Sequence, residues 1–183
     1  MKSKIIIFTL LLAALWGMPR RAAAQFFAVR ADALAALAGT LHLGVEASVA
    51  DKWTLETSGY WNPIRTSGLS MNFGAVQIGP RYWFYESFVG HFIGAQLSWA
   101  GYDLGRRTRR YDGNACGIGL SYGYAWMLSK RWNVAVEAGI GLFHTRDTRR
   151  DPTVPDWEDE YIYHTRRWTL LPSRLEVSFS YLF

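Results

Sequence analysis

The clearest pattern along the chain is a strict alternation of apolar and polar side chains within short segments. At the carboxyl end, residues 175–183 put Leu, Val, Phe, Tyr and Phe on one face of an extended chain, with Glu and Ser on the other. A period of two over this length predicts a β-strand with one apolar and one polar face. Residues 116–128 show the same pattern. The alternation therefore predicts an all-β chain.

Eight such segments can be counted, separated by turn-forming residues. They cover about residues 27–37, 41–49, 53–61, 71–84, 93–99, 116–128, 132–142 and 168–183. The stretch 31–38 is rich in Ala and Leu and also suits a helix, but we expect it to continue the first strand, with Ala33, Ala35 and Leu37 on the outer face. Pro80, inside the fourth segment, indicates a bulge or a local break in the strand.

The lengths of the connections follow the order of the strands. Short turns near residues 51, 86 and 130 alternate with longer connections near 66, 109 and 156, and only the tight turn near 39 departs from this rule. Outer-membrane barrels have short periplasmic turns and longer extracellular loops. We therefore predict an eight-stranded antiparallel up-and-down transmembrane β-barrel in the bacterial outer membrane, with both termini periplasmic. A soluble lipocalin-like carrier would need an apolar interior, whereas here the inner face carries the charges.

The amino-terminal segment has the features of a secretory signal peptide. Lys2 and Lys4 precede an apolar stretch, and Ala22 to Ala24 offer a small-residue cleavage site. We expect residues 1–24 to be removed and residues 25–183 to form one barrel domain. The whole chain has 20 basic and 15 acidic residues, but four basic ones lie in this segment, so 16 and 15 remain. This near balance argues against a nucleic-acid partner.

An ordered set of short segments resembles a known family. The segments are 43–46 (LGVE), 52–55 (KWTL), 62–63 (NP), 81–83 (RYW), 90–94 (GHFIG), 121–124 (SYGY) and 128–133 (LSKRWN). Together they resemble a family of Bacteroidetes outer-membrane proteins classed as a domain of unknown function. The resemblance covers about residues 29–136 and the final strand. It implies an eight-stranded barrel, some members of which lie near surface-fibre or adhesin systems, and it brings no catalytic residues.

Charged side chains form the main candidate site, because the alternation places them inside the barrel. They are Arg30, Asp32, Glu46, Glu56, Arg81, Glu137, Arg174 and Glu176. Side chains just fill the interior of an eight-stranded barrel, and charges removed from water are tolerated only when they are paired. We expect Arg30 and Arg81 to bridge several glutamates and to plug the lumen. An ion or proton pathway, or a carboxylate pair in acid–base catalysis, is the alternative.

Two predicted outer loops carry the candidate binding residues. Residues 105–114 hold Arg106, Arg107, Arg109 and Arg110, whose guanidinium groups suit phosphates of lipopolysaccharide or an acidic glycan. A solvated loop that merely tolerates charge explains them equally well. Residues 146–167 mix charges with Trp and Tyr, which suit a contact with a surface protein or a glycan, or a cap on the barrel mouth.

Four histidines raise the question of an enzyme: His42, His91, His144 and His164. A hydrolase acting on lipid A or on surface peptides needs a histidine oriented by a carboxylate beside a serine or an activated water. No spacing in this sequence nominates such a set, so we expect no catalytic residues, although such an outer-membrane enzyme remains the alternative function. We also expect no cofactor and no metal site; a single cysteine, Cys116, allows neither an intramolecular disulfide nor a thiolate-ligated metal.

The final strand supplies the last prediction. Phe179, Tyr181 and Phe183 lie on its apolar face, and a terminal strand ending on Phe resembles the assembly signal of outer-membrane barrels. We expect the barrel assembly machinery to recognise it. The expected role is structural or adhesive, as a monomer in lipid and lipopolysaccharide that binds a surface protein or glycan through its outer loops.

Overall fold

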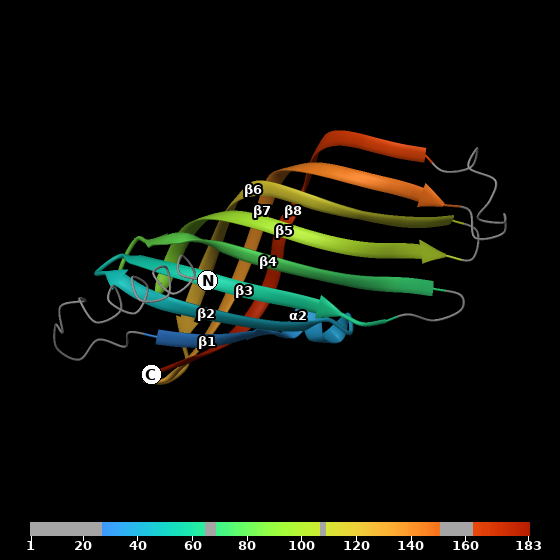
Figure 1. The fold of residues 1–183 in the computed structure, drawn as a ribbon. Helices are drawn as coiled ribbons and strands as arrows, with labels where there is room; N and C mark the ends of the chain where they lie inside the picture. The colour runs from blue at the N-terminus through green and yellow to red at the C-terminus, as the bar shows by residue number, and fades with distance from the viewer. Residues whose placement is uncertain (1–26, 65–68, 107–108, 151–162) are drawn as a thin grey trace, which may run out of the picture.

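The structure, a computed structural model, describes residues 27–64, 69–106, 109–150 and 163–183. Eight antiparallel strands form a closed barrel in which each strand pairs with the next and the last pairs with the first (Figure 1). The predicted all-β fold and up-and-down order are confirmed, whereas the predicted signal peptide, residues 1–24, lies outside the described residues. The elements are β1 (Phe27–Asp32), α2 (Ala33–Leu37), β2 (Leu41–Ala50), β3 (Trp53–Asn62), β4 (Leu69–Trp83), β5 (Gly90–Arg106), β6 (Arg109–Met127), β7 (Trp132–Arg150) and β8 (Tyr163–Leu182).

The strands differ greatly in length, so the barrel has a part formed by all eight strands and a part formed by β4 to β8 alone. β1 has 6 residues and β2 and β3 have 10 each, but β5 to β8 have 17 to 20. We call the end with the turns β2–β3, β4–β5 and β6–β7 the lower end. In Figure 1 the lower end lies at the left and the opposite, upper end at the right, where the strands β4 to β8 extend well past β1 to β3. β8 pairs with β1 only from Ser178 to Leu182 but with β7 as far as Tyr163.

Residues 33–37 correct the prediction that the first strand continues to Leu37, because they form the helix α2. Asp32 ends the strand. Its carboxylate accepts a hydrogen bond from Leu34 N at 2.9 Å, as a helix N-cap does, and another from Val177 N at 3.1 Å. The high helix propensity of Ala and Leu then decides the conformation. Gly39, with φ of +72°, turns the chain into β2.

The bounds of the two long outer loops are also corrected, since strands extend into both of them. In place of a loop at 105–114, β5 runs to Arg106 and β6 begins at Arg109, and these two residues pair. In place of a loop at 146–167, β7 runs to Arg150 and β8 begins at Tyr163, not near Trp168; residues 151–162 lie outside the described residues. Backbone pairing satisfies N–H and C=O groups whatever the side chains are, so loss of hydrophobic alternation does not end a strand.

Pro80 interrupts a strand pair without shifting it. β4 and β5 pair up to Ile78 and again from Arg81, in one register, so the break is local and no bulge occurs there. A shift of register lies instead between β7 and β8. Gly139 pairs with Arg174 and Ile140 with Pro172, which leaves Ser173 as the extra residue. Above this bulge the opposite set of β8 side chains faces inward.

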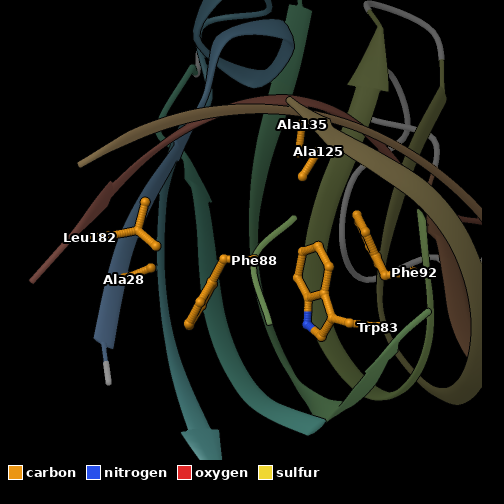
Figure 2. Packing of buried hydrophobic residues seen from close by; sticks show 7 residues of the cluster. All are labelled: Ala28, Trp83, Phe88, Phe92, Ala125, Ala135 and Leu182. Atoms are coloured by element: carbon orange, nitrogen blue, oxygen red, sulfur yellow. The ribbon is translucent and has the colours of Figure 1, made fainter. Parts of the chain in front are cut away.

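The outer face carries the apolar side chains that the alternation predicted. Leu43, Leu97, Leu120 and Leu175 are 61–70% exposed. The lower end of the interior is apolar as well, which the alternation did not predict. Figure 2 shows this cluster, which consists of Ala28, Trp83, Phe88, Phe92, Ala125, Ala135 and Leu182. The described residues include no helix long and apolar enough to cross a membrane.

Phe88 closes the lower end from a turn. Its φ is +72°, an uncommon value for a residue with a side chain, yet its ring is 5% exposed and lies 6.0 Å from the ring of Trp83. Asn133 Nδ2 donates to the Phe88 carbonyl at 2.6 Å. Burial of the ring and this hydrogen bond offset the backbone strain, and the short turn thereby contributes to the core.

Candidate functional site: the charged barrel interior

Above the apolar cluster, charged side chains fill the interior. Every charged residue that the alternation assigned to the inner face is at most 5% exposed: Arg30, Asp32, Glu46, Glu56, Arg81, Glu137, Arg174 and Glu176. They come from β1, β2, β3, β4, β7 and β8, so their proximity depends on closure of the barrel. Seven of them form one ion-pair network. Asp32 stands apart, because its carboxylate binds backbone N–H groups.

Arg81 makes close ion pairs with three carboxylates. Its Nη1 lies 2.7 Å from Glu46 Oε2 and its Nη2 lies 2.8 Å from Glu56 Oε2. Nη2 also donates to Glu137. The guanidinium carbon lies 4.8 Å from the ring centre of Phe92, a cation–π distance. Arg81 thus joins three carboxylates from three other strands and rests on the lower apolar cluster.

Arg174 was predicted to belong to the inner charged set, and the structure gives it a bridging role equal to that of Arg81. Its Nη1 lies 2.6 Å from Glu56 Oε2 and 3.2 Å from Glu137 Oε1. Its Nη2 donates to Gln77 Oε1 at 2.6 Å and to Ser58 Oγ at 3.3 Å. The bulge at Ser173 lies beside it. Alternation identified Arg174 as an inner residue, but only the pairing of β8 with β7 places it opposite Gly139, within reach of Glu137.

Arg30 completes the network from the shortest strand. It donates to Glu56 Oε1, and its Nε lies 3.3 Å from Glu176 Oε1. Glu46 and Glu137 each lie 3.8 Å from its Nη1. The expected bridging of glutamates by Arg30 and Arg81 therefore describes the geometry, with Arg174 added.

The network contains three guanidinium groups and four carboxylates, so the carboxylates are in excess by one. Neither carboxylate oxygen of Glu176 accepts a hydrogen bond, although both lie near arginine nitrogens. His42, 9% exposed, lies at the edge of this region with its ring 4.4 Å from that of Tyr60, and neither of its ring nitrogens has a hydrogen-bond partner. Removing one arginine would leave buried carboxylates without compensation. The arrangement suits a rigid plug.

The other described histidines contact aromatic rings. His91 lies 2.6 Å from the Tyr122 hydroxyl, and the His144 ring lies 5.2 Å from that of Trp168; the His164 side chain lies outside the described residues. Within the described ranges, no group of three or more His, Cys, Asp or Glu residues is placed to hold a metal ion.

The remaining predicted site residues lie at the two ends. Of the basic cluster, Arg107 lies outside the described residues. Arg106, Arg109 and Arg110 lie on the strand tips at the upper end, where Arg110 pairs with Arg150. At the lower end, Phe179 and Phe183 are 47% and 66% exposed on the outer face, and the Tyr181 hydroxyl accepts a hydrogen bond from Arg131 at 3.0 Å.

One protein-family match describes the chain. The model of DUF3575, a protein of unknown function, matches residues 6–183. This agrees with the resemblance at the level of a family without known function and a barrel of eight strands. No curated protein matches the chain.

Proposed function

Because the chain belongs to the DUF3575 family, whose function is unknown, we propose a role from the geometry. The protein is a small outer-membrane β-barrel with an ion-paired plug in its lumen. It acts as a structural or adhesive component and binds a partner through its outer end. The alternative, an outer-membrane enzyme for lipid A or surface peptides, has less support, because the ring contacts of His42, His91 and His144 are with aromatic residues.

The observation that carries this proposal is the belt of exposed apolar side chains around charged interior residues. Leu, Ile, Val and Trp side chains cover the outside of β2 to β8, which in water would be a very large apolar surface. Trp53, Trp126 and Trp132 lie near the lower edge of the belt and are 46–49% exposed. Trp99 and Trp168 lie near its upper edge. Aromatic side chains prefer the two membrane interfaces.

The ends of the chain support an outer-membrane location. The start of β1 pairs with the end of β8 at the lower end, where the short turns lie. In a barrel with the usual orientation this end is periplasmic. The predicted signal peptide would direct export, and the outward-facing Phe179 and Phe183 are accessible for recognition by the barrel assembly machinery.

The upper end then faces outward and is the proposed partner surface. The arginine-bearing tips of β5, β6 and β7 lie together there and suit phosphates of lipopolysaccharide or an acidic glycan. A surface protein or a neutral glycan are alternatives for the same end. Because its interior is filled by paired charges, we propose that the monomer does not conduct ions.

The test is expression of the full chain in a Gram-negative host, followed by membrane fractionation and a detergent gel with and without heating. We expect the protein in the outer-membrane fraction, with faster migration before heating than after. A protein that stays in solution without detergent, or that migrates identically in both samples, would end the membrane proposal.

A further inference from the structure

The alternation of side chains inverts at the upper end of the long strands. Along β5 and β6 the outward residues change from Leu97, Trp99 and Ile118 to Asp103, Asp112 and Asn114. The inward residues change in the opposite sense. Just below the level of Trp99 they include the charged network with Gln77 and Gln96. Above that level they are largely apolar or aromatic on β4 to β6, whereas β7 and β8 contribute Phe143 and Leu171 together with threonines, Asp147 and Arg167. Polar outside and apolar inside is the pattern of a sheet in water that covers something apolar.

These inward residues line a cavity of about 650 Å³. All its lining residues come from β4 to β8, and its apolar and aromatic ones include Phe73, Ala100, Tyr111, Phe143 and Leu171. The floor lies above the charged network, at Gln77 and Ser173. The volume lies within the range of small-molecule sites, which are mostly apolar with a few polar groups. Tyr111 and Leu171 are 39% and 38% exposed, so the cavity presents apolar surface that a ligand could bury.

The polar groups of this cavity indicate what kind of molecule fits it. Ser98 lines the cavity, is 8% exposed, and its hydroxyl has no hydrogen-bond partner. Nearer the mouth, Asp147 accepts a hydrogen bond from the Tyr102 hydroxyl and lies 3.7 Å from Arg167. Burial and this hydrogen bond raise the pKa of Tyr102 above its ordinary value, so its hydroxyl remains a donor to the carboxylate. The charges of Asp147 and Arg167 cancel.

We propose that this cavity binds a small uncharged amphiphile, a molecule with an apolar body and one hydroxyl or carbonyl group. The body packs against the aromatic wall, and the polar group pairs with the Ser98 hydroxyl, which is otherwise buried without a partner. An ionised ligand gains nothing from a wall whose two charges neutralise each other. The ligand enters from the aqueous side, because the outer face around the cavity is polar. This inference rests on the proposed outward orientation of the upper end and adds a small-molecule ligand to the partners proposed there.

The test is calorimetric titration of the full chain, held in an amphipathic polymer instead of detergent, with 1-decanol as the probe. Decanoate serves as a charged probe of equal length, and the polymer alone serves as the blank. Ala100→Trp fills the cavity, whereas Ala95→Trp puts the same side chain on the outer face of the same strand. We expect saturable decanol binding, weakened about tenfold or more by Ala100→Trp and within about twofold of wild type in Ala95→Trp.

Other results would overturn the site. The proposal is wrong if the heats of decanol titration equal those of the polymer blank, if wild type and Ala100→Trp bind decanol with equal affinity, or if decanoate binds as tightly as decanol. A dimer of the wild-type chain that Ala100→Trp dissociates would instead make a second copy the occupant. Heat-modifiable migration of the same samples separates the two proposals. If migration shifts but decanol does not bind, the cavity assignment alone is wrong, and if migration does not shift, the membrane proposal is wrong.

Discussion

At the scale of single residues, Arg81 shows how the interior depends on pairing. Its guanidinium contacts Glu46, Glu56 and Glu137, all of them at most 4% exposed. Replacing Arg81 with Met keeps most of the volume but leaves these carboxylates with less positive charge in a place where water has little access. Breaking a buried ion pair by removing one partner costs about 3–5 kcal/mol. We expect Arg81→Met to lower the free energy of unfolding by that amount, measured by urea unfolding of the folded barrel.

The matched control for Arg81 is Arg131→Met at the lower rim. Arg131 is exposed and donates to the Tyr181 hydroxyl at 3.0 Å, so its loss should change stability by less than about 0.5 kcal/mol. Equal unfolding curves for Arg81→Met and wild type would mean that the network contributes nothing to stability. Equal losses in both variants would mean that any loss of a positive charge destabilises the barrel.

The inner position of these residues could be predicted from the sequence, but their partners could not. Alternation alone assigns Arg30, Glu56 and Arg174 to the inner face, because the period of a strand is fixed. Which carboxylate meets which arginine depends on strand register and on closure between β1 and β8, and these bring together residues more than a hundred positions apart. The bulge at Ser173 adds a change of face that no pattern in the sequence marks.

At the scale of elements, the first strand and its helix show where pattern reading stops. The alternation of residues 27–37 fits a strand to its end, and helix propensity supported the other choice. Asp32 favours the helix through a tertiary contact, because its carboxylate accepts hydrogen bonds from both Leu34 N in α2 and Val177 N in β8. The turn between β4 and β5 shows the same limit. Its position could be predicted, but the positive φ of Phe88 and the burial of its ring could not.

Asp32 therefore has a double role that can be tested. In Asp32→Ala the N-cap of α2 and the acceptor for Val177 N are both lost, and we expect stability to fall by about 1–2 kcal/mol. Hydrogen exchange at the amides of Leu34 and Val177 should quicken, while amides in the middle of β6 stay protected. Asp51→Ala, at an exposed turn, is the control. Unchanged exchange at both amides would show that the cap does not hold the end of the strand.

At the scale of the whole molecule, the interior has three layers with different side chains. An apolar cluster closes the lower end, paired charges fill the middle, and an apolar cavity opens above. The outer face follows a different division, apolar up to the level of Trp99 and polar beyond it. Where the outside is apolar, the middle layer inside is charged; where the outside is polar, the inside is apolar. The same long strands thus combine two side-chain patterns, the one expected of a barrel in lipid and the one expected of a sheet in water.

The closure of this barrel gives the last prediction, which concerns Phe183. Its ring is 66% exposed on the outer face, with its centre 4.9 Å from that of Tyr181 in an edge arrangement, while its N–H donates to the Phe27 carbonyl at 2.9 Å. Deletion of Phe183 removes one hydrogen bond, about 0.5–1.5 kcal/mol, and little packing. We expect urea unfolding of refolded protein to change by no more than that.

Assembly in cells should respond to the same deletion far more strongly, because an exposed terminal ring is accessible to the assembly machinery before the barrel has closed. The amount of heat-modifiable protein in the outer membrane should fall several-fold for the chain without Phe183. Tyr85→Ala removes another exposed aromatic at the lower rim, 68% exposed, and should leave assembly unchanged. If deletion of Phe183 lowers assembly and stability in proportion, the residue acts through folding alone; if it alters neither, the terminal ring is not the feature recognised.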